Sequence, residues 1–176
     1  MATVFPQMEE QVVTELAQFG VRYLSRQSNL GTVIPRAPQD FLAALVRQPS
    51  SRVRSAVIAL LLARPDFALY VPAALQQLKA PDAQTLRFFY TAAVYLQEQY
   101  ADALKFFLSE KWRPLPDLYS KKLGLSGDTP ATRLKSLARL HAQKTGKYLN
   151  WAGTYENAAR HLLRRWEMER IMNRRK

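Results

Sequence analysis

Apolar residues recur every three or four positions along most of the chain, which is the spacing of one face of a helix. The first helix that this spacing predicts has an apolar face made by Met8, Val12, Leu16, Phe19 and Tyr23. Pro6 lies near its start, and the Asn-Leu-Gly sequence at 29–31 is its expected end. Residues 32–34 (Thr-Val-Ile) have the one extended pattern, and Pro35 cuts it short.

Proline residues divide the following segment into further helices. Pro38 opens a helix with apolar residues at 41, 42, 45 and 46, and the Pro-Ser-Ser sequence at 49–51 ends it. The same Pro-Ser-Ser sequence offers an N-cap to the next helix, since a serine hydroxyl can accept from a free backbone N–H. The pattern predicts an all-α protein with about seven or eight helices and no sheet of more than two short strands.

Two segments of the N-terminal half are similar to one another. Residues 51–61 are followed 33 positions later by residues 84–94, so that Arg54 aligns with Arg87 and Ala59 with Ala92. With the intervening Ala-rich helix, residues 49–94 resemble a HEAT-type helical repeat, which implies helix pairs stacked around a continuous core. An ordinary helical bundle has the same Ala/Leu pattern, so both arrangements remain open.

Charge and aromatic content change together after Leu108. The 176 residues carry a formal net charge of +12. Residues 1–108 hold 10 Lys and Arg against 8 Asp and Glu, whereas residues 109–176 hold 16 against 6. All eight Phe precede this boundary and all three Trp follow it. The sequence therefore predicts an apolar helical region (1–108) and a basic helical region (109–176) within one compact unit. Such one-sided charge favours an anionic partner, with a solubilising surface as the alternative.

Residues 117–137 are similar to a helix-turn-helix unit of winged-helix regulators. Ser120 lies four positions before the turn glycine, Gly124, and leucines flank that glycine on both sides. A basic second helix is predicted to start with Thr129 as N-cap and Pro130 at its first position. The resemblance implies that this second helix contacts nucleic acid. Pro130 departs from the family pattern and no wing strands are evident, so a simple helical hairpin is the alternative.

The basic helix and the last helix each have a distinct polar face. In the basic helix, which is predicted to end at Gly146, Leu134, Leu137 and His141 share the inward face. The opposite face is made by Thr132, Lys135, Ser136, Arg139 and Gln143. The last helix is expected to start at Thr154, with an apolar stripe on one side and Arg160 and Arg164 on the other. It leads into a basic tail at residues 170–176.

Motifs for catalysis are missing from the sequence. There is no cysteine, neither of the two histidines lies at metal-ligand spacing from another ligand, and no glycine-rich phosphate loop occurs. His141 is interpreted as a packed core residue. The N-terminus is unlike a secretory signal, and the longest uncharged apolar run is residues 57–63. We therefore expect a cytoplasmic protein that is not an enzyme, needs no metal or cofactor and has no membrane partner.

Taken together, the sequence favours a non-catalytic protein whose basic half binds the phosphate backbone of DNA or RNA. The predicted binding residues are Thr132, Lys135, Ser136, Arg139, Gln143, Arg160, Arg164, Arg170, Arg174, Arg175 and Lys176. The alternative is a helical adaptor or structural subunit that docks a protein partner through the helices between residues 51 and 108. Both roles can coexist in a small subunit of a nucleoprotein complex.

Overall fold

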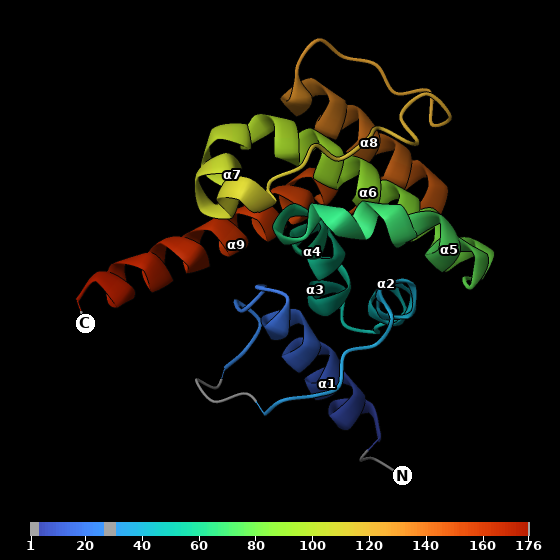
Figure 1. Ribbon diagram of the computed structural model, residues 1–176. Helices are drawn as coiled ribbons and strands as arrows, with labels where there is room; N and C mark the ends of the chain where they lie inside the picture. Colours follow the sequence, from blue (N-terminus) through green and yellow to red (C-terminus); the bar gives the residue numbers. More distant parts are fainter. Residues whose placement is uncertain (1–3, 27–30, 176) are drawn as a thin grey trace.

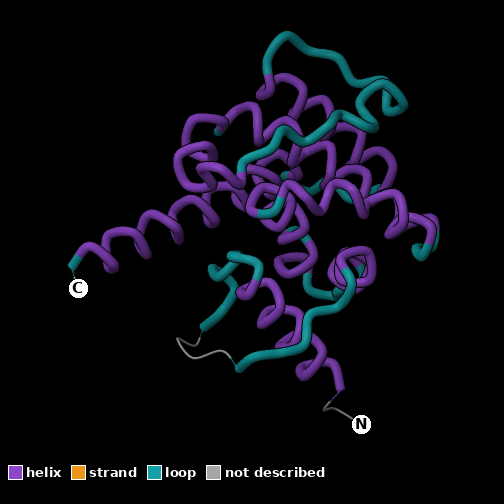
Figure 2. The backbone as a smooth tube through the Cα atoms, viewed as in Figure 1, coloured by secondary structure: helices purple, strands orange, loops and turns teal. Residues whose placement is uncertain are grey.

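A computed structural model describes residues 4–26 and 31–175, and these residues form helices and loops without any strand (Figures 1 and 2). The all-α prediction is confirmed. The α-helices are α1 (Val4–Gln18), α2 (Pro38–Val46), α3 (Ser51–Arg54), α4 (Ala56–Ala63), α5 (Val71–Gln76), α6 (Ala80–Gln99), α7 (Ala101–Leu108), α8 (Pro130–Thr145) and α9 (Trp151–Arg174). Two 3-10 helices, η1 (Pro65–Tyr70) and η2 (Ser109–Lys111), complete the set.

The centre of the molecule is α4, whose sequence AVIALLLA contains no polar residue. A helix that is apolar on every side must be covered on every side. Accordingly, all eight α4 residues are buried, with at most 6% of any of them exposed. Helices α2, α6 and α9 and the 3-10 helix η1 pack around it, while α8 packs on α6 and α9 one layer further out (Figure 1).

This arrangement is a bundle around a central helix, and it differs from a stack of HEAT-type repeats. In a repeat stack each unit contacts only its neighbours in sequence. Here the C-terminal helix α9 packs directly on α4, and Trp166 donates a hydrogen bond of 2.9 Å to the carbonyl of Gly20. Residues from both predicted regions, from Val12 to Leu162, belong to one apolar core.

The N-terminal helix ends earlier than the sequence predicts. α1 stops at Gln18, and Gly20 follows with a φ of 94°, a conformation that favours glycine. Residues 27–30, which include most of the expected stop, lie outside the described residues. The extended segment at 31–37 forms no strand, but the Gln18 amide replaces a strand partner: it donates to the carbonyl of Val33 at 3.1 Å and accepts from its N–H at 3.4 Å.

A second correction concerns the helix-turn-helix resemblance. Residues 112–129 contain no helix, only a turn at 119–124, so the expected first helix of that unit is not formed (Figure 2). The prolines at 114 and 116 disfavour helix here, and side chains of α6 hold the chain in extended form. Gln97 donates to the carbonyl of Arg113 at 2.8 Å and accepts from the N–H of Leu115 at 2.7 Å. Tyr90 donates to the carbonyl of Pro116, and Tyr95 bonds the hydroxyl of Ser120.

Among the described helices, no single one is both long and apolar enough to cross a bilayer; only a bent pair, Ser51–Ala63 with Pro65–Gln76 at 113°, reaches that length and hydropathy.

The carboxylate of Glu15 ties α1 to the chain that leads into α2, and it is 2% exposed. It accepts hydrogen bonds from the backbone N–H of Arg36 at 2.6 Å and from its guanidinium at 2.9 Å. We predict that Glu15→Ala lowers the free energy of unfolding by about 1–3 kcal/mol, because a donor at a half-buried site loses its acceptor.

Urea denaturation measures this loss. Glu10→Ala is the matched control, since Glu10 is an exposed carboxylate on the same helix, and it should change stability by less than about 0.5 kcal/mol. Equal stabilities of the two variants would contradict a structural role for the Glu15–Arg36 pair.

Candidate nucleic-acid interface

Helix α8 has a well-defined start and end, as its sequence predicts. Thr129 caps it, and Pro130 occupies its first position. The Thr129 hydroxyl accepts from the N–H of Thr132, while the Thr132 hydroxyl accepts from the N–H of Thr129, which makes a reciprocal capping box. Gly146 ends the helix in the left-handed conformation, with a φ of 65°. These two signals fix which residues of α8 face the body.

The inward face of α8 is apolar and includes His141, as predicted. Leu134, Leu137 and His141 are buried, and His141 is 1% exposed. Its ring stacks on Trp151 with 3.6 Å between centroids and on Phe88 with 4.4 Å. Its Nδ1 shares a hydrogen bond of 2.6 Å with the hydroxyl of Tyr155. Burial, together with the positive charge of Arg54, lowers the pKa of His141 to about 4, so the ring is neutral at pH 7.

The outward face of α8 contains the five residues that the sequence assigns to it, but they differ in availability. Lys135, Arg139 and Gln143 are exposed at four-residue spacing, and none has a hydrogen bond or ion pair to any described residue. Thr132 is used by the capping box. Ser136 is half-buried and donates to the carbonyl of Thr132 at 3.2 Å. The available surface of this helix is therefore made by its long side chains.

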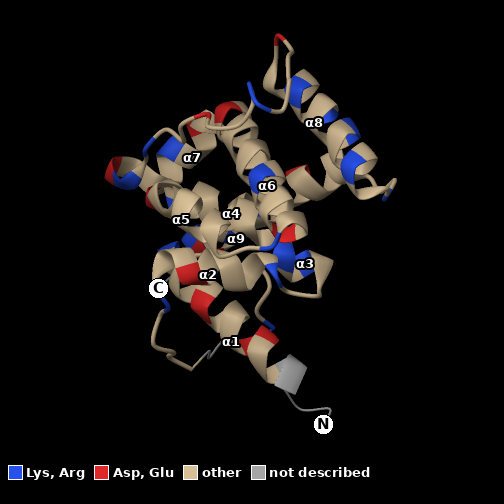
Figure 3. Ribbon diagram, turned by 90° about the vertical axis from the view of Figure 1, so that its right-hand side faces the viewer, with Lys and Arg blue, Asp and Glu red and all other residues tan. Residues whose placement is uncertain are grey.

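The charge on this surface has no acidic counterpart nearby in sequence. From residue 129 to residue 155 the chain contains no Asp or Glu. Of the four Lys and Arg residues on α8, only Arg133 has a carboxylate partner among the described residues, Glu98 at 2.6 Å, and it also lies over the ring of Tyr95. Lys135, Arg139 and Lys144 are exposed cations, and Figure 3 shows basic residues along the outer side of α8.

The predicted binding residues of α9 lie elsewhere on the molecule. Arg160 and Arg164 are exposed on the side of α9 opposite its buried stripe, and Arg160 pairs with Glu156 at 3.2 Å. Helix α9 starts at Trp151, with Asn150 as N-cap, three residues before the start that the sequence predicts. Its C-terminal end projects from the body and points away from α8 (Figures 1 and 3).

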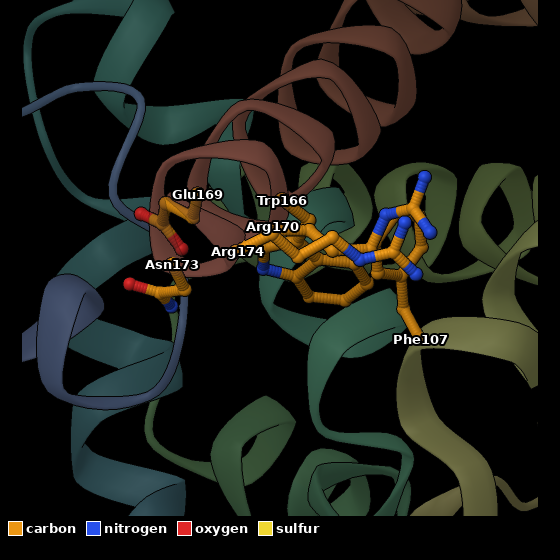
Figure 4. Close-up of a pocket in the computed structure, with 6 residues that line it drawn as sticks. All are labelled: Phe107, Trp166, Glu169, Arg170, Asn173 and Arg174. Atoms are coloured by element: carbon orange, nitrogen blue, oxygen red, sulfur yellow. The ribbon is translucent and has the colours of Figure 1, made fainter. Parts of the chain in front are cut away.

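The projecting end of α9 contains the rest of the predicted residues and a shallow hollow. Arg170 pairs with Glu167 at 2.6 Å and lies over the exposed ring of Phe106. Arg174 and Arg175 are exposed, and Lys176 lies outside the described residues. An open hollow of about 470 Å³ is lined here by Phe107, Trp166, Glu169, Arg170, Asn173 and Arg174 (Figure 4).

The turn between α8 and α9 adds surface that the sequence analysis did not assign. Lys144 is exposed in the last turn of α8, and Lys147 and Tyr148 are exposed in the segment that follows it. The acid-free run at 129–155 is the sequence signal that points to them, because it continues past the end of the helix. The turn therefore extends the basic surface of α8, which we call the α8 basic face: Lys135, Arg139, Gln143, Lys144 and Lys147.

The pKa of His141 predicts how stability depends on pH. An unfolded histidine titrates near 6.5, whereas folded His141 titrates near 4, so the unfolded state binds more protons between these values. Stability is therefore fully present above pH 6.5 and falls towards pH 4, by up to about 1.4 kcal/mol per pH unit from this group.

Chemical denaturation at pH 7.0, 6.0 and 5.0 measures that slope. His141→Gln should be less stable at pH 7 but should lose less stability between pH 7 and pH 5 than the wild type. An unchanged slope in the variant would contradict burial of a neutral imidazole.

The predicted binding residues thus fall into two groups, one on α8 and the other on α9. The sequence predicts a distinct polar face for each of these helices, and in the structure the end of α9 points away from α8 (Figure 1). No protein-family model matches the chain, and searches of curated proteins and of solved structures give no match at the required significance.

Proposed function

We propose that this protein binds nucleic acid without catalysing a reaction, and that the α8 basic face contacts phosphate groups. The observation that carries the proposal is the set of exposed cations at 135, 139, 144 and 147, on a segment without Asp or Glu. A surface of this kind attracts a polyanion and gains free energy when the phosphates release their counterions. Phosphate contacts alone carry no sequence information, so the proposal concerns affinity and leaves the bases unassigned.

The geometry of α8 suits this role because the helix is fixed independently of its outer face. Its cap, its stop and its buried residues hold it against α6 and α9. Lys135, Arg139 and Gln143 follow one another by about 6 Å along the helix axis, since each residue advances the helix by about 1.5 Å. The exposed side chains can thus be occupied by a ligand without any loss of packing.

A second candidate function, docking of a protein partner, has a separate observation in its favour. Phe106 on α7 and Met168, Ile171 and Met172 on the projecting end of α9 are exposed large apolar side chains. Such residues are typical of contact surfaces when they gather in one place. The helices at 51–63 are a poor docking surface, because α4 is buried on every side. Within the predicted docking region at 51–108, this candidate function therefore uses α7, together with the neighbouring end of α9.

We predict that Lys135→Ala combined with Arg139→Ala weakens binding to generic DNA and RNA at least tenfold at low salt. The slope of log affinity against log salt should become shallower by about 1.8 on duplex DNA, since each lost phosphate contact removes about 0.9. Fluorescence anisotropy titrations at several salt concentrations measure both quantities. Thermal stability should stay within about 0.5 kcal/mol of the wild type.

Two controls separate charge from folding. Lys79→Ala with Lys111→Ala removes the same charge from exposed positions outside α8 and should leave most of the affinity intact. Leu137→Ala should lower stability by about 2–5 kcal/mol, because it truncates a buried leucine beneath the basic face. Loss of affinity in both charge variants alike would indicate a general charge effect and would overturn the assignment to α8.

We also predict that Arg174→Ala with Arg175→Ala weakens binding to all sequences by the same factor and makes the salt slope shallower. Both side chains are exposed at the tip of α9, where they can contact phosphates without reading bases. Met172→Ala is the matched control, since it changes the same tip without changing charge. An unaltered salt slope in the arginine variant would restrict nucleic-acid contact to α8.

A further inference from the structure

The turn between α8 and α9 presents an aromatic ring to solvent. Tyr148 is 85% exposed, and it has neither a hydrogen bond nor a ring contact with any residue that the structure describes. Its neighbour Leu149 is 58% exposed. The acid-free sequence around it places Lys147 directly before the tyrosine and Lys144 four positions before it, and both lysines are exposed.

The backbone that presents Tyr148 is held on both sides. Before it, α8 ends at Gly146, and the N–H of Lys147 donates a hydrogen bond to the hydroxyl of Thr145 at 3.4 Å. After it, the backbone N–H of Trp151 donates to the carbonyl of Leu149 at 2.8 Å, and the indole N–H of Trp151 donates to the carbonyl of Lys147 at 3.0 Å. Trp151 is itself buried and stacked on His141, so the turn is attached directly to the core. The exposed ring therefore projects from an anchored turn.

An exposed aromatic ring beside cations has a specific use in nucleic-acid binding. The flat face of an unpaired base stacks on such a ring, while the neighbouring lysines neutralise the phosphates on either side of that base. In an uninterrupted duplex, each base face is already covered by the next base pair. A ring of this kind thus adds affinity for single strands, loops and ends, and adds little for duplexes.

We propose that Tyr148 is a stacking platform for one unpaired base, and that the protein prefers single-stranded nucleic acid to duplex. This inference rests on the proposed function and extends it, because it names the form of nucleic acid that is bound. Lys144 and Lys147 act as the phosphate contacts that flank the stacked base. The α8 basic face then receives the rest of the strand.

Anisotropy titrations with three labelled probes test the preference: a single-stranded RNA, a single-stranded DNA and a duplex DNA, each of about 12 nucleotides or base pairs. The wild type should bind the single strands more tightly than the duplex. Tyr148→Ala should weaken single-strand binding by about 5- to 100-fold and leave duplex binding within about twofold. Tyr148→Phe keeps the ring and should bind like the wild type.

Two further variants distinguish stacking from a general apolar contact. Leu149→Ala removes the neighbouring exposed apolar side chain and should change affinity less than twofold. Tyr148→Trp should show stronger quenching of tryptophan fluorescence on addition of single-stranded DNA than the wild type shows, because the new indole stacks on a base. An equal loss of single-strand affinity in Leu149→Ala and Tyr148→Ala, or no added quenching in Tyr148→Trp, would contradict base stacking on Tyr148.

The failure of this inference differs from the failure of the proposed function. If the wild type binds all three probes and Tyr148→Ala binds them as tightly, the stacking platform is wrong while nucleic-acid binding stands. If the wild type binds none of the probes at low salt, both proposals are wrong. If the wild type prefers the duplex, the α8 basic face remains as a phosphate surface without a base contact at Tyr148.

Discussion

The burial of α4 is the constraint on which the rest of the structure depends. Eight consecutive apolar residues offer no side that tolerates water, so the chain must cover this helix completely. Helices α2, α6 and α9 and the 3-10 helix η1 provide that cover, and they come from both halves of the sequence. Helix α8 packs on α6 and α9, outside the layer that covers α4. The α8 basic face therefore lies in the outermost layer, where its cations stay hydrated.

The sequence predicts the helices well where a local signal marks their ends. Ser50 caps α3 as expected, accepting from the N–H of Val53, and Thr129 and Gly146 mark both ends of α8. The wheel of α8 also places Leu134 and Leu137 inside and Lys135 outside, which the burial confirms. Periodicity is reliable for these elements because each helix has a single buried face and a distinct cap.

The remaining differences have long-range causes. The segment at 117–125 has leucines and a turn glycine, yet it forms a turn and no helix. Just before it, Gln97 and Tyr90 of α6 bond the backbone of residues 113–116 in extended form, and Tyr95 bonds the side chain of Ser120. Nothing in the local sequence specifies these contacts. For the candidate site, the exposure of Arg139 and of Arg174 could each be predicted from the sequence, but not their positions relative to one another. The separation between α8 and the end of α9 depends on the path of α9 across the core (Figure 1).

Helix α9 is one uninterrupted rod of 24 residues, about 36 Å long, with two different halves. Its first half, with Tyr155 and Leu162, is packed in the core; in its second half Trp166 still packs against that core, and residues 171–174 form the exposed tip. No loop or hinge separates the two halves. A force on the exposed tip, for example from a bound partner, is therefore transmitted along the helix to the residues that pack on α4. A tilt of the whole helix would strain the hydrogen bond from Trp166 to Gly20 and the packing around Leu162 together.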